Sequence, residues 1–183
     1  MVKLTGGNKL LDVSQILSKI KIEEGMKVAD LGCGSTGFFV FPVAKIVGKK
    51  GEVYGVDILR NALENINRRA RQENINNVKT VWTDLEVFNA TKIETASLDT
   101  ALIINTLYLS HKRVEIMREA MRMVRTGGKV VVIEWKNVAS PFGPPSEERV
   151  KEELLKEGGK KLGLKLEEEF FAGRYHYGVI FTK

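Results

Sequence analysis

The sequence predicts an α/β fold with a doubly wound, mostly parallel sheet of seven strands that closes with an antiparallel C-terminal hairpin. Short apolar runs alternate with amphipathic helical patterns along most of the chain. Strands that are continuous apolar runs are typical of a parallel sheet covered by helices on both faces. Near the C-terminus, two strand patterns are separated only by the short turn at Ala172-Gly173. So short a turn requires the two strands to be antiparallel.

The first half of the chain is predicted to contain a leading helix followed by strands and helices in alternation. Apolar residues recur at three- and four-residue spacing from Leu10 to Ile20, and this helix is expected to end near Gly25. Pro42 fits the second helix only in its first turn, where a missing N–H group breaks no hydrogen bond. The segments expected after the leading helix are a strand over 27–31, a helix over 38–47, a strand over 52–57, a helix over 59–74 and a strand over 78–82.

The second half continues the alternation until the final hairpin. The expected segments are a strand over 98–104, a helix over 112–124, a strand over 129–135, a helix over 146–157 and strands over 164–171 and 175–181. Residues 137–146 contain three of the four prolines, so they form a stiff loop. We interpret this loop, with Phe142, as a lid or a wall for a substrate, and the alternative is a plain connection.

Length and composition predict one domain over residues 1–183, because 183 residues with 43% hydrophobic content suffice for one α/β core but not for two. No apolar run approaches the ~20 residues of a membrane span. The segment Met1-Val-Lys-Leu also lacks the apolar region of a signal peptide. Cys33 is the single cysteine, so no intrachain disulfide can form. These features predict a cytoplasmic protein.

The formal charge of +6 raises the question of a nucleic-acid partner. Most basic residues, however, are interleaved with acidic ones, which is typical of a solvated surface. The exception is a cluster on the predicted outer helix, formed by Arg60, Arg68, Arg69 and Arg71. A nucleic-acid partner therefore stays open as an alternative but is not favoured.

The most informative segment is residues 28–39, VADLGCGSTGFF, in which an apolar strand opens into a glycine-rich turn before a helix. Glycines let the backbone turn sharply and approach a ligand closely, and the first turn of the helix offers unpaired N–H groups. The second strand, in residues 51–57 (GEVYGVD), ends in Asp57. A carboxylate there can accept hydrogen bonds from both hydroxyls of a ribose. Together these features predict a nucleotide-binding site.

With these motifs the chain resembles the class I S-adenosylmethionine-dependent methyltransferases. Residues 30–34 (DLGCG) match the first motif of that family, and Asp57 matches its ribose-binding acid. Residues 82–85 (WTDL) match the segment whose carboxylate faces the adenine amino group. Residues 98–105 and 124–134 match the fourth and fifth strand motifs. The third glycine, Gly37, lies one position later than in the compact family form.

The resemblance implies a Rossmann-like fold and S-adenosylmethionine as the cofactor, with S-adenosylhomocysteine as the product. The small-molecule branch that includes ubiquinone and menaquinone C-methyltransferases is the most similar. The cofactor-binding residues that the resemblance implies are Asp30, Gly32, Cys33, Gly34, Gly37, Phe38, Asp57, Ile58, Asp84, Leu85 and Asn105. For Asn105, ending its strand is an equally good explanation. For Cys33, the small size of the side chain explains its place in the turn better than thiol reactivity does.

Methyl transfer from a sulfonium is an in-line displacement that depends mainly on alignment and on the exclusion of water. A base is needed only if the acceptor must lose a proton. His111 and His176 are the candidates for that role, because both are expected near the carboxyl ends of the strands. The alternatives are that His111 caps the following helix and that His176 is a structural residue. No metal ligands are expected.

The expected function is methyl transfer to a small-molecule acceptor. An RNA or protein methyltransferase and a non-catalytic cofactor-binding or interaction module are the alternatives. A nicotinamide oxidoreductase is disfavoured by the terminal hairpin and by the motif after the third strand. The sequence leaves a homodimer open and does not identify the acceptor.

Overall fold

The computed structural model describes residues 10–183, so the expectation for Met1-Val-Lys-Leu lies outside the described residues. In chain order the elements are α1 (Val13–Ile20), β1 (Lys27–Leu31), α2 (Val40–Val47), β2 (Glu52–Asp57), α3 (Arg60–Gln72), β3 (Val78–Trp82), β4 (Leu98–Ile104), the 3-10 turn η2 (Leu107–Leu109), α4 (Arg113–Met123), β5 (Val124–Trp135), α5 (Glu152–Lys161), β6 (Lys165–Gly173) and β7 (His176–Thr182).

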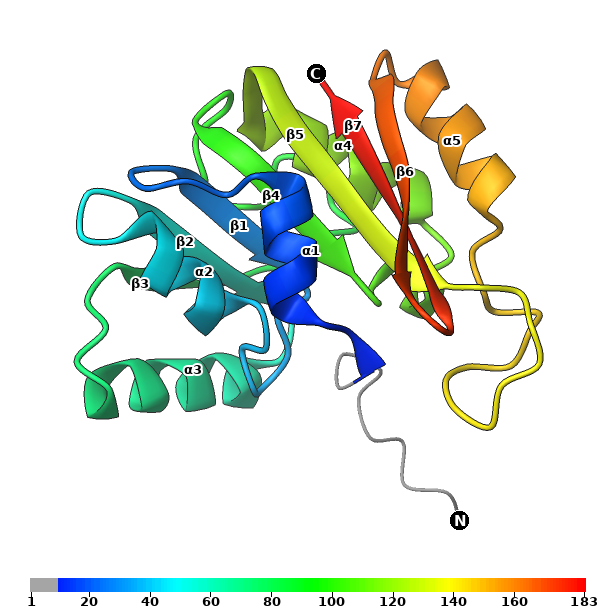
Figure 1. The fold of residues 1–183 in the computed structure, drawn as a ribbon. Coiled ribbons are helices and arrows are strands. Elements are labelled where there is room, and N and C mark those ends of the chain that lie inside the picture. The colour runs from blue at the N-terminus through cyan, green and yellow to red at the C-terminus, as the bar shows by residue number, and fades with distance from the viewer. Residues whose placement is uncertain (1–9) are drawn as a thin grey trace.

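The strands form a seven-stranded sheet in the order β3-β2-β1-β4-β5-β7-β6 (Figure 1). Neighbours among the first five strands in this order are parallel, whereas β7 is antiparallel to both β5 and β6. The predicted doubly wound sheet with its C-terminal hairpin is therefore confirmed. Within residues 10–183, no helix combines the length and the apolar character needed to cross a membrane.

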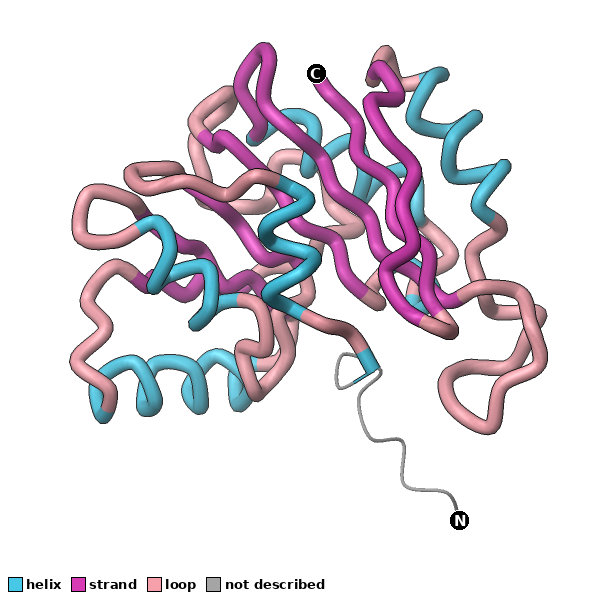
Figure 2. Tube along the Cα trace, viewed as in Figure 1, coloured by secondary structure: helices cyan, strands magenta, loops and turns pink. Residues whose placement is uncertain are grey.

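Two apolar cores lie on opposite faces of the sheet. Helices α1, α2 and α3 cover one face, and α4 and α5 cover the other (Figures 1 and 2). Their buried side chains complete the two cores. Residues along the central strand alternate between them, since Leu102 and Ile104 join the first core while Ala101 and Ile103 join the second. Burial of both faces explains why these strands are continuous apolar runs in the sequence.

The boundaries of several elements differ from those predicted, among them α1, which ends at Ile20 rather than near Gly25. Helix α2 starts at Val40 rather than at residue 38, which leaves Pro42 in its first turn as required. Strand β5 begins at Val124, where the backbone is already extended, and its pairing with β4 shifts register near Gly127 and Gly128. The first five residues of this strand, 124–128, lack an apolar pattern, so the sequence did not predict them as part of the strand.

Helix α5 begins at Glu152 rather than at residue 146. The preceding residues instead form turns around Arg149, whose guanidinium donates to the carbonyl oxygens of Pro144 (3.0 Å), Lys136 (2.8 Å) and Val138 (2.6 Å). Arg149 therefore holds the proline-rich loop, which is the long loop at the lower right of Figure 2, against the end of β5. Arg149 makes these contacts from the turns that follow residue 145, so this part of the chain packs with the loop rather than extending α5.

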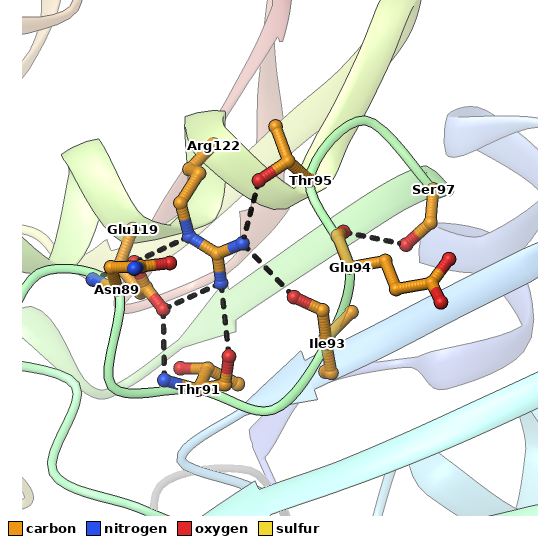
Figure 3. Close-up of polar contacts among 8 residues, drawn as sticks. All are labelled: Asn89, Thr91, Ile93, Glu94, Thr95, Ser97, Glu119 and Arg122. Atoms are coloured by element: carbon orange, nitrogen blue, oxygen red, sulfur yellow. Dashed lines mark hydrogen bonds and ion pairs between the residues drawn. The ribbon is translucent and has the colours of Figure 1, made fainter.

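The irregular segment 83–97, which connects β3 to β4, is attached to α4 by hydrogen bonds between its backbone and a buried ion pair of that helix, Glu119 with Arg122 (Figure 3). The Glu119 carboxylate accepts hydrogen bonds from the backbone amides of Asn89 (2.7 Å) and Thr91 (3.1 Å) and from Arg122 (Nη2–Oε1, 2.8 Å). Arg122 also donates to the carbonyl oxygens of Thr91 and Ile93. Burial opposes the charged form, but these hydrogen bonds lower the pKa of Glu119 to about 2.

Replacement Glu119→Gln should lower the free energy of unfolding by about 3–5 kcal/mol, because it leaves the Arg122 guanidinium buried without its counter-ion. Denaturant unfolding measures this change. The matched control is Glu115→Gln, which removes the exposed ion pair of Glu115 with Arg118 at the same three-residue spacing on the same helix. The control should change stability by less than about 1 kcal/mol. Equal losses in the two variants would contradict this prediction.

Candidate functional site

A cavity of about 450 Å³ opens at the carboxyl ends of β1, β2, β3 and β4. Strand order reverses between β1 and β4, which is where open parallel sheets bind ligands. Four segments and one helical residue line the cavity: the glycine turn (Gly32 and Gly34), the end of β2 with the start of α3 (57–59), residues 83–86, residues 104–110 except Leu107, and Ile116.

The glycine turn is shaped by two different steric constraints. Gly32 and Gly34 both have positive φ angles, +84° and +62°. A Cβ atom on Gly32 would lie 2.4 Å from the Thr106 hydroxyl oxygen, so no side chain fits there. A Cβ atom on Gly34 would meet nothing within 4 Å. Gly32 thus permits tight packing inside the protein, whereas Gly34 leaves its backbone exposed to the cavity.

The Asp57 carboxylate connects the glycine turn to the start of α3. Its Oδ2 accepts a hydrogen bond from the Gly34 amide, and its Oδ1 accepts one from the Leu59 amide, each at 2.9 Å. The residue is 8% exposed and lines the cavity. Each carboxylate oxygen can accept a second hydrogen bond. Asp57 can therefore accept from a vicinal diol while it holds the turn.

Asp30 lies on β1 directly before the glycine turn and is 3% exposed. Burial and then the negative charge of Asp57 raise the pKa of Asp30 to about 7. Within residues 10–183, no lysine or arginine forms an ion pair with either carboxylate. Because neither carboxylate has a counter-ion there, the negative charge that the pair carries is uncompensated, which suits a cationic ligand.

Asp84 and Leu85 form the part of the cavity wall that follows β3. The Asp84 carboxylate accepts a hydrogen bond from the Glu86 amide (2.9 Å), and the Glu86 carboxylate accepts one from the Ser110 hydroxyl (2.7 Å). The wall after β3 is thereby linked to the wall after β4. Ile58, which follows Asp57, is 55% exposed and adds an apolar side chain to the rim.

The predicted cofactor-binding residues fall into two groups. Those that line the cavity are Gly32, Gly34, Asp57, Ile58, Asp84, Leu85 and Asn105. Those that do not line it are Asp30, Cys33, Gly37 and Phe38. Burial is the main cause of a raised pKa for the Cys33 thiol, so this thiol is not activated.

The structure brings neither histidine to the cavity. His176 is completely buried and lies against Trp135, with the ring centres 4.2 Å apart. Burial and then the charges of Lys136 and Arg149 lower the pKa of His176 to about 4. His111 is exposed and lines a separate groove between α4 and α5. Trp135 is itself a core residue, with 2% of its surface exposed.

Several residues that line the cavity were not predicted individually. They are Leu59, Thr83, Glu86, Ile104, Thr106, Tyr108, Leu109, Ser110 and Ile116. The segment after the fourth strand was expected at this edge, but an apolar sequence such as Leu107-Tyr-Leu gives no sign of which side chains point into a cavity. The 3-10 turn η2 takes its position from contacts with β5 and α4, which local sequence does not show.

The comparisons with known proteins agree with this site. A family model described as a methyltransferase domain matches residues 22–169. The demethylmenaquinone methyltransferase of Lactococcus lactis is 29% identical over 118 residues, which are 64% of this chain and 45% of that protein. A probable cobalt-precorrin-6B C(15)-methyltransferase (decarboxylating) of Saccharolobus solfataricus is 31% identical over 117 residues, 63% of this chain and 56% of that protein. The chain thus spans about half the length of these curated relatives.

The fold also has close structural neighbours. A SAM-dependent methyltransferase from Aquifex aeolicus superimposes with a TM-score of 0.87 over 97% of this chain and 92% of that chain, at 22% sequence identity. At this identity the likeness shows a shared fold. The family model covers most of the sequence, and its match agrees with the motifs around the glycine turn and Asp57. The chain therefore belongs to the methyltransferase domain family, and the resemblance of its sequence to class I S-adenosylmethionine-dependent methyltransferases is confirmed.

Proposed function

We propose that this chain binds S-adenosylmethionine and transfers its methyl group to a small-molecule acceptor by in-line displacement. The observation that carries the proposal is the pair of buried carboxylates, Asp30 and Asp57, beside a glycine turn at the reversal of strand order. Both Asp57 and Asp84 line the cavity, and in this proposal Asp57 binds the ribose hydroxyls while Asp84 binds the adenine amino group. The uncompensated negative charge favours a ligand with a sulfonium and an ammonium group.

The chemistry requires little covalent help from the protein. When bound, the cofactor supplies an electrophilic methyl group on a sulfonium. The side chains of Ile58, Leu59, Leu109 and Ile116 give the cavity apolar walls that displace water. Asp57 and Asp84 orient what binds, and alignment with the acceptor accounts for most of the acceleration.

The protein needs to supply a base only if the acceptor carries a proton that must leave. His111 and His176 do not line the cavity, so we assign this role to neither. An acceptor that is nucleophilic without prior deprotonation needs no base from the protein.

A small molecule is favoured as the acceptor by the cavity and by the relatives. The cavity of about 450 Å³ lies in the range of sites that bind small molecules. Relatives named for demethylmenaquinone and for a cobalt precorrin methylate small molecules. On this basis the proposed acceptor is a small molecule with an apolar part.

Replacements Asp57→Asn and Asp84→Asn should each weaken S-adenosylmethionine binding about 10- to 150-fold, because each removes a charged hydrogen-bond acceptor worth ~1.5–3 kcal/mol. Isothermal titration calorimetry measures the affinities. Thermal shifts with S-adenosylmethionine, S-adenosylhomocysteine, NAD and NADP test which cofactor binds, because a ligand of the native state raises the melting temperature.

The matched control for these variants is Glu64→Gln, which neutralises an exposed carboxylate on α3 outside the cavity lining. It should bind with unchanged affinity. Stabilisation by NAD or NADP alone would refute the proposed cofactor. Cofactor binding without turnover across a pool of acceptors would favour a binding module instead.

The stability contributed by Asp30 should fall as the pH rises. Its folded-state pKa of about 7 lies above the ordinary value of 3.8, so the folded protein holds this proton more tightly than the unfolded chain. The contribution is complete below pH about 4 and is lost as the pH rises through 7, by about 1.4 kcal/mol per unit of pKa difference. Denaturant unfolding from pH 4 to 8 should give a shallower decline for Asp30→Asn than for the wild type. Parallel curves would show that Asp30 does not titrate in this range.

A further inference from the structure

The segment that connects β4 to α4 forms one wall of the cavity and contains an unusual backbone conformation. Asn105 has a φ of +52°, in the left-handed region that is uncommon for residues other than glycine. Its amide still donates to the carbonyl oxygen of Ile133 on β5 (2.9 Å). The chain turns sharply there and enters η2. Such a conformation persists where the surrounding contacts hold it.

The contact at the start of this turn comes from Glu134, which is completely buried at the end of β5. Its Oε1 accepts hydrogen bonds from the amides of Thr106 (2.9 Å) and Leu107 (2.6 Å). These are amides at the beginning of η2, where a helical turn has no backbone acceptor of its own. One charged oxygen therefore holds two successive residues of the cavity wall.

The other end of the turn is held by Arg113 of α4. Its Nε donates to the carbonyl oxygens of Leu107 and Ser110, each at 3.0 Å, and its Nη2 donates to that of Glu148 (2.8 Å). The Glu134 carboxylate thus binds the amide end of the turn, and the Arg113 guanidinium binds its carbonyl end. This arrangement complements the dipole of the turn.

Thr106 connects this turn to the glycine turn, because its side chain packs against the backbone there. Its hydroxyl donates to the carbonyl oxygen of Leu31 (3.0 Å), and its Oγ1 occupies the space that a Cβ atom of Gly32 would need. A shift of Thr106 would consequently disturb the backbone next to Gly34 and Asp57. The position of Glu134 thus affects both walls of the cavity.

We propose that Glu134 is a positioning residue for the cofactor cavity: its ionised carboxylate holds the turn after β4, and through Thr106 it holds the glycine turn in the geometry that binds the cofactor. This inference rests on the proposed function and extends it to a residue that does not line the cavity. It also makes cofactor affinity depend on the ionisation of Glu134.

The surroundings of Glu134 place its ionisation near neutral pH. Burial raises the pKa of Glu134 to about 7 although the backbone amides oppose the shift. Tyr108 of η2 and Tyr177 of β7 are the titratable groups nearby, and burial followed by the Glu134 charge raises the pKa of both. Arg113 of α4 and Glu152 of α5 act on Tyr177 with opposite signs. Within residues 10–183, no cation pairs with Glu134.

The test measures S-adenosylhomocysteine affinity between pH 6 and pH 8. Because Asp30 titrates in the same range, the comparison uses Asp30→Asn as the background. The Asp30→Asn protein should bind at least threefold more weakly at pH 6 than at pH 8, whereas the double variant with Glu134→Gln should bind weakly and without this pH dependence. Tyr177→Phe is the matched control, because it removes a buried hydrogen bond to Val150 beside Glu134 without touching the turn. Added to the Asp30→Asn background, this control should leave the affinity and pH profile of that background unchanged.

A second measurement needs no variant. In the wild type, the amide proton resonances of Thr106 and Leu107 should shift between pH 6 and pH 8 together with the Glu134 side-chain carboxyl carbon. Resonances that do not move, or a Glu134→Gln protein with the affinity and pH profile of its background, would overturn the inference while leaving the proposed function intact. A wild-type protein that binds neither adenosyl compound at any pH would overturn both.

Discussion

The hydrogen bonds that the Asp57 carboxylate accepts from Gly34 and Leu59 are the interaction on which the site depends. They join the turn after β1 to the helix after β2 at the point where strand order reverses. The Val56 carbonyl oxygen holds the amides of Gly32 and Cys33, and the Asp57 carboxylate extends this hold to Gly34. The same carboxylate lines the cavity, so the group that builds the turn is also available to a ligand.

Buried charges organise the irregular connections of this protein by binding backbone groups. Glu134 binds amides after β4, Glu119 binds amides after β3, and Arg149 binds carbonyls after β5. Of these, only Glu119 has an ion-pair partner among the described residues, Arg122. A buried charge is tolerated where backbone dipoles replace water as its solvent. Each connection at the carboxyl edge thereby acquires one conformation, which a loop without such contacts would lack.

The carboxyl edge of the sheet has one region with acidic side chains and another with basic ones. Asp30, Asp57 and Glu134 lie toward the cavity, and burial keeps the pKa of Asp30 and of Glu134 near neutrality. Lys136 and Arg149 lie near Trp135 and His176, where they and the lack of solvent keep the imidazole neutral. The negative region is the one suited to a cationic cofactor, whereas the buried histidine belongs to the packing that supports the proline-rich loop.

The sequence by itself determined the succession of strands and helices along the chain, the hairpin and the glycine turn with Asp57. These follow from local rules: apolar runs, glycine and a turn too short for a crossover. Only the tertiary structure decided which side chains meet. The roles of Thr106 and Glu134 depend on contacts between residues 28 and 75 positions apart, and His176 is excluded from the cavity by the neighbours that bury it. Such roles come from packing across the sheet, and local residue patterns carry no record of that packing.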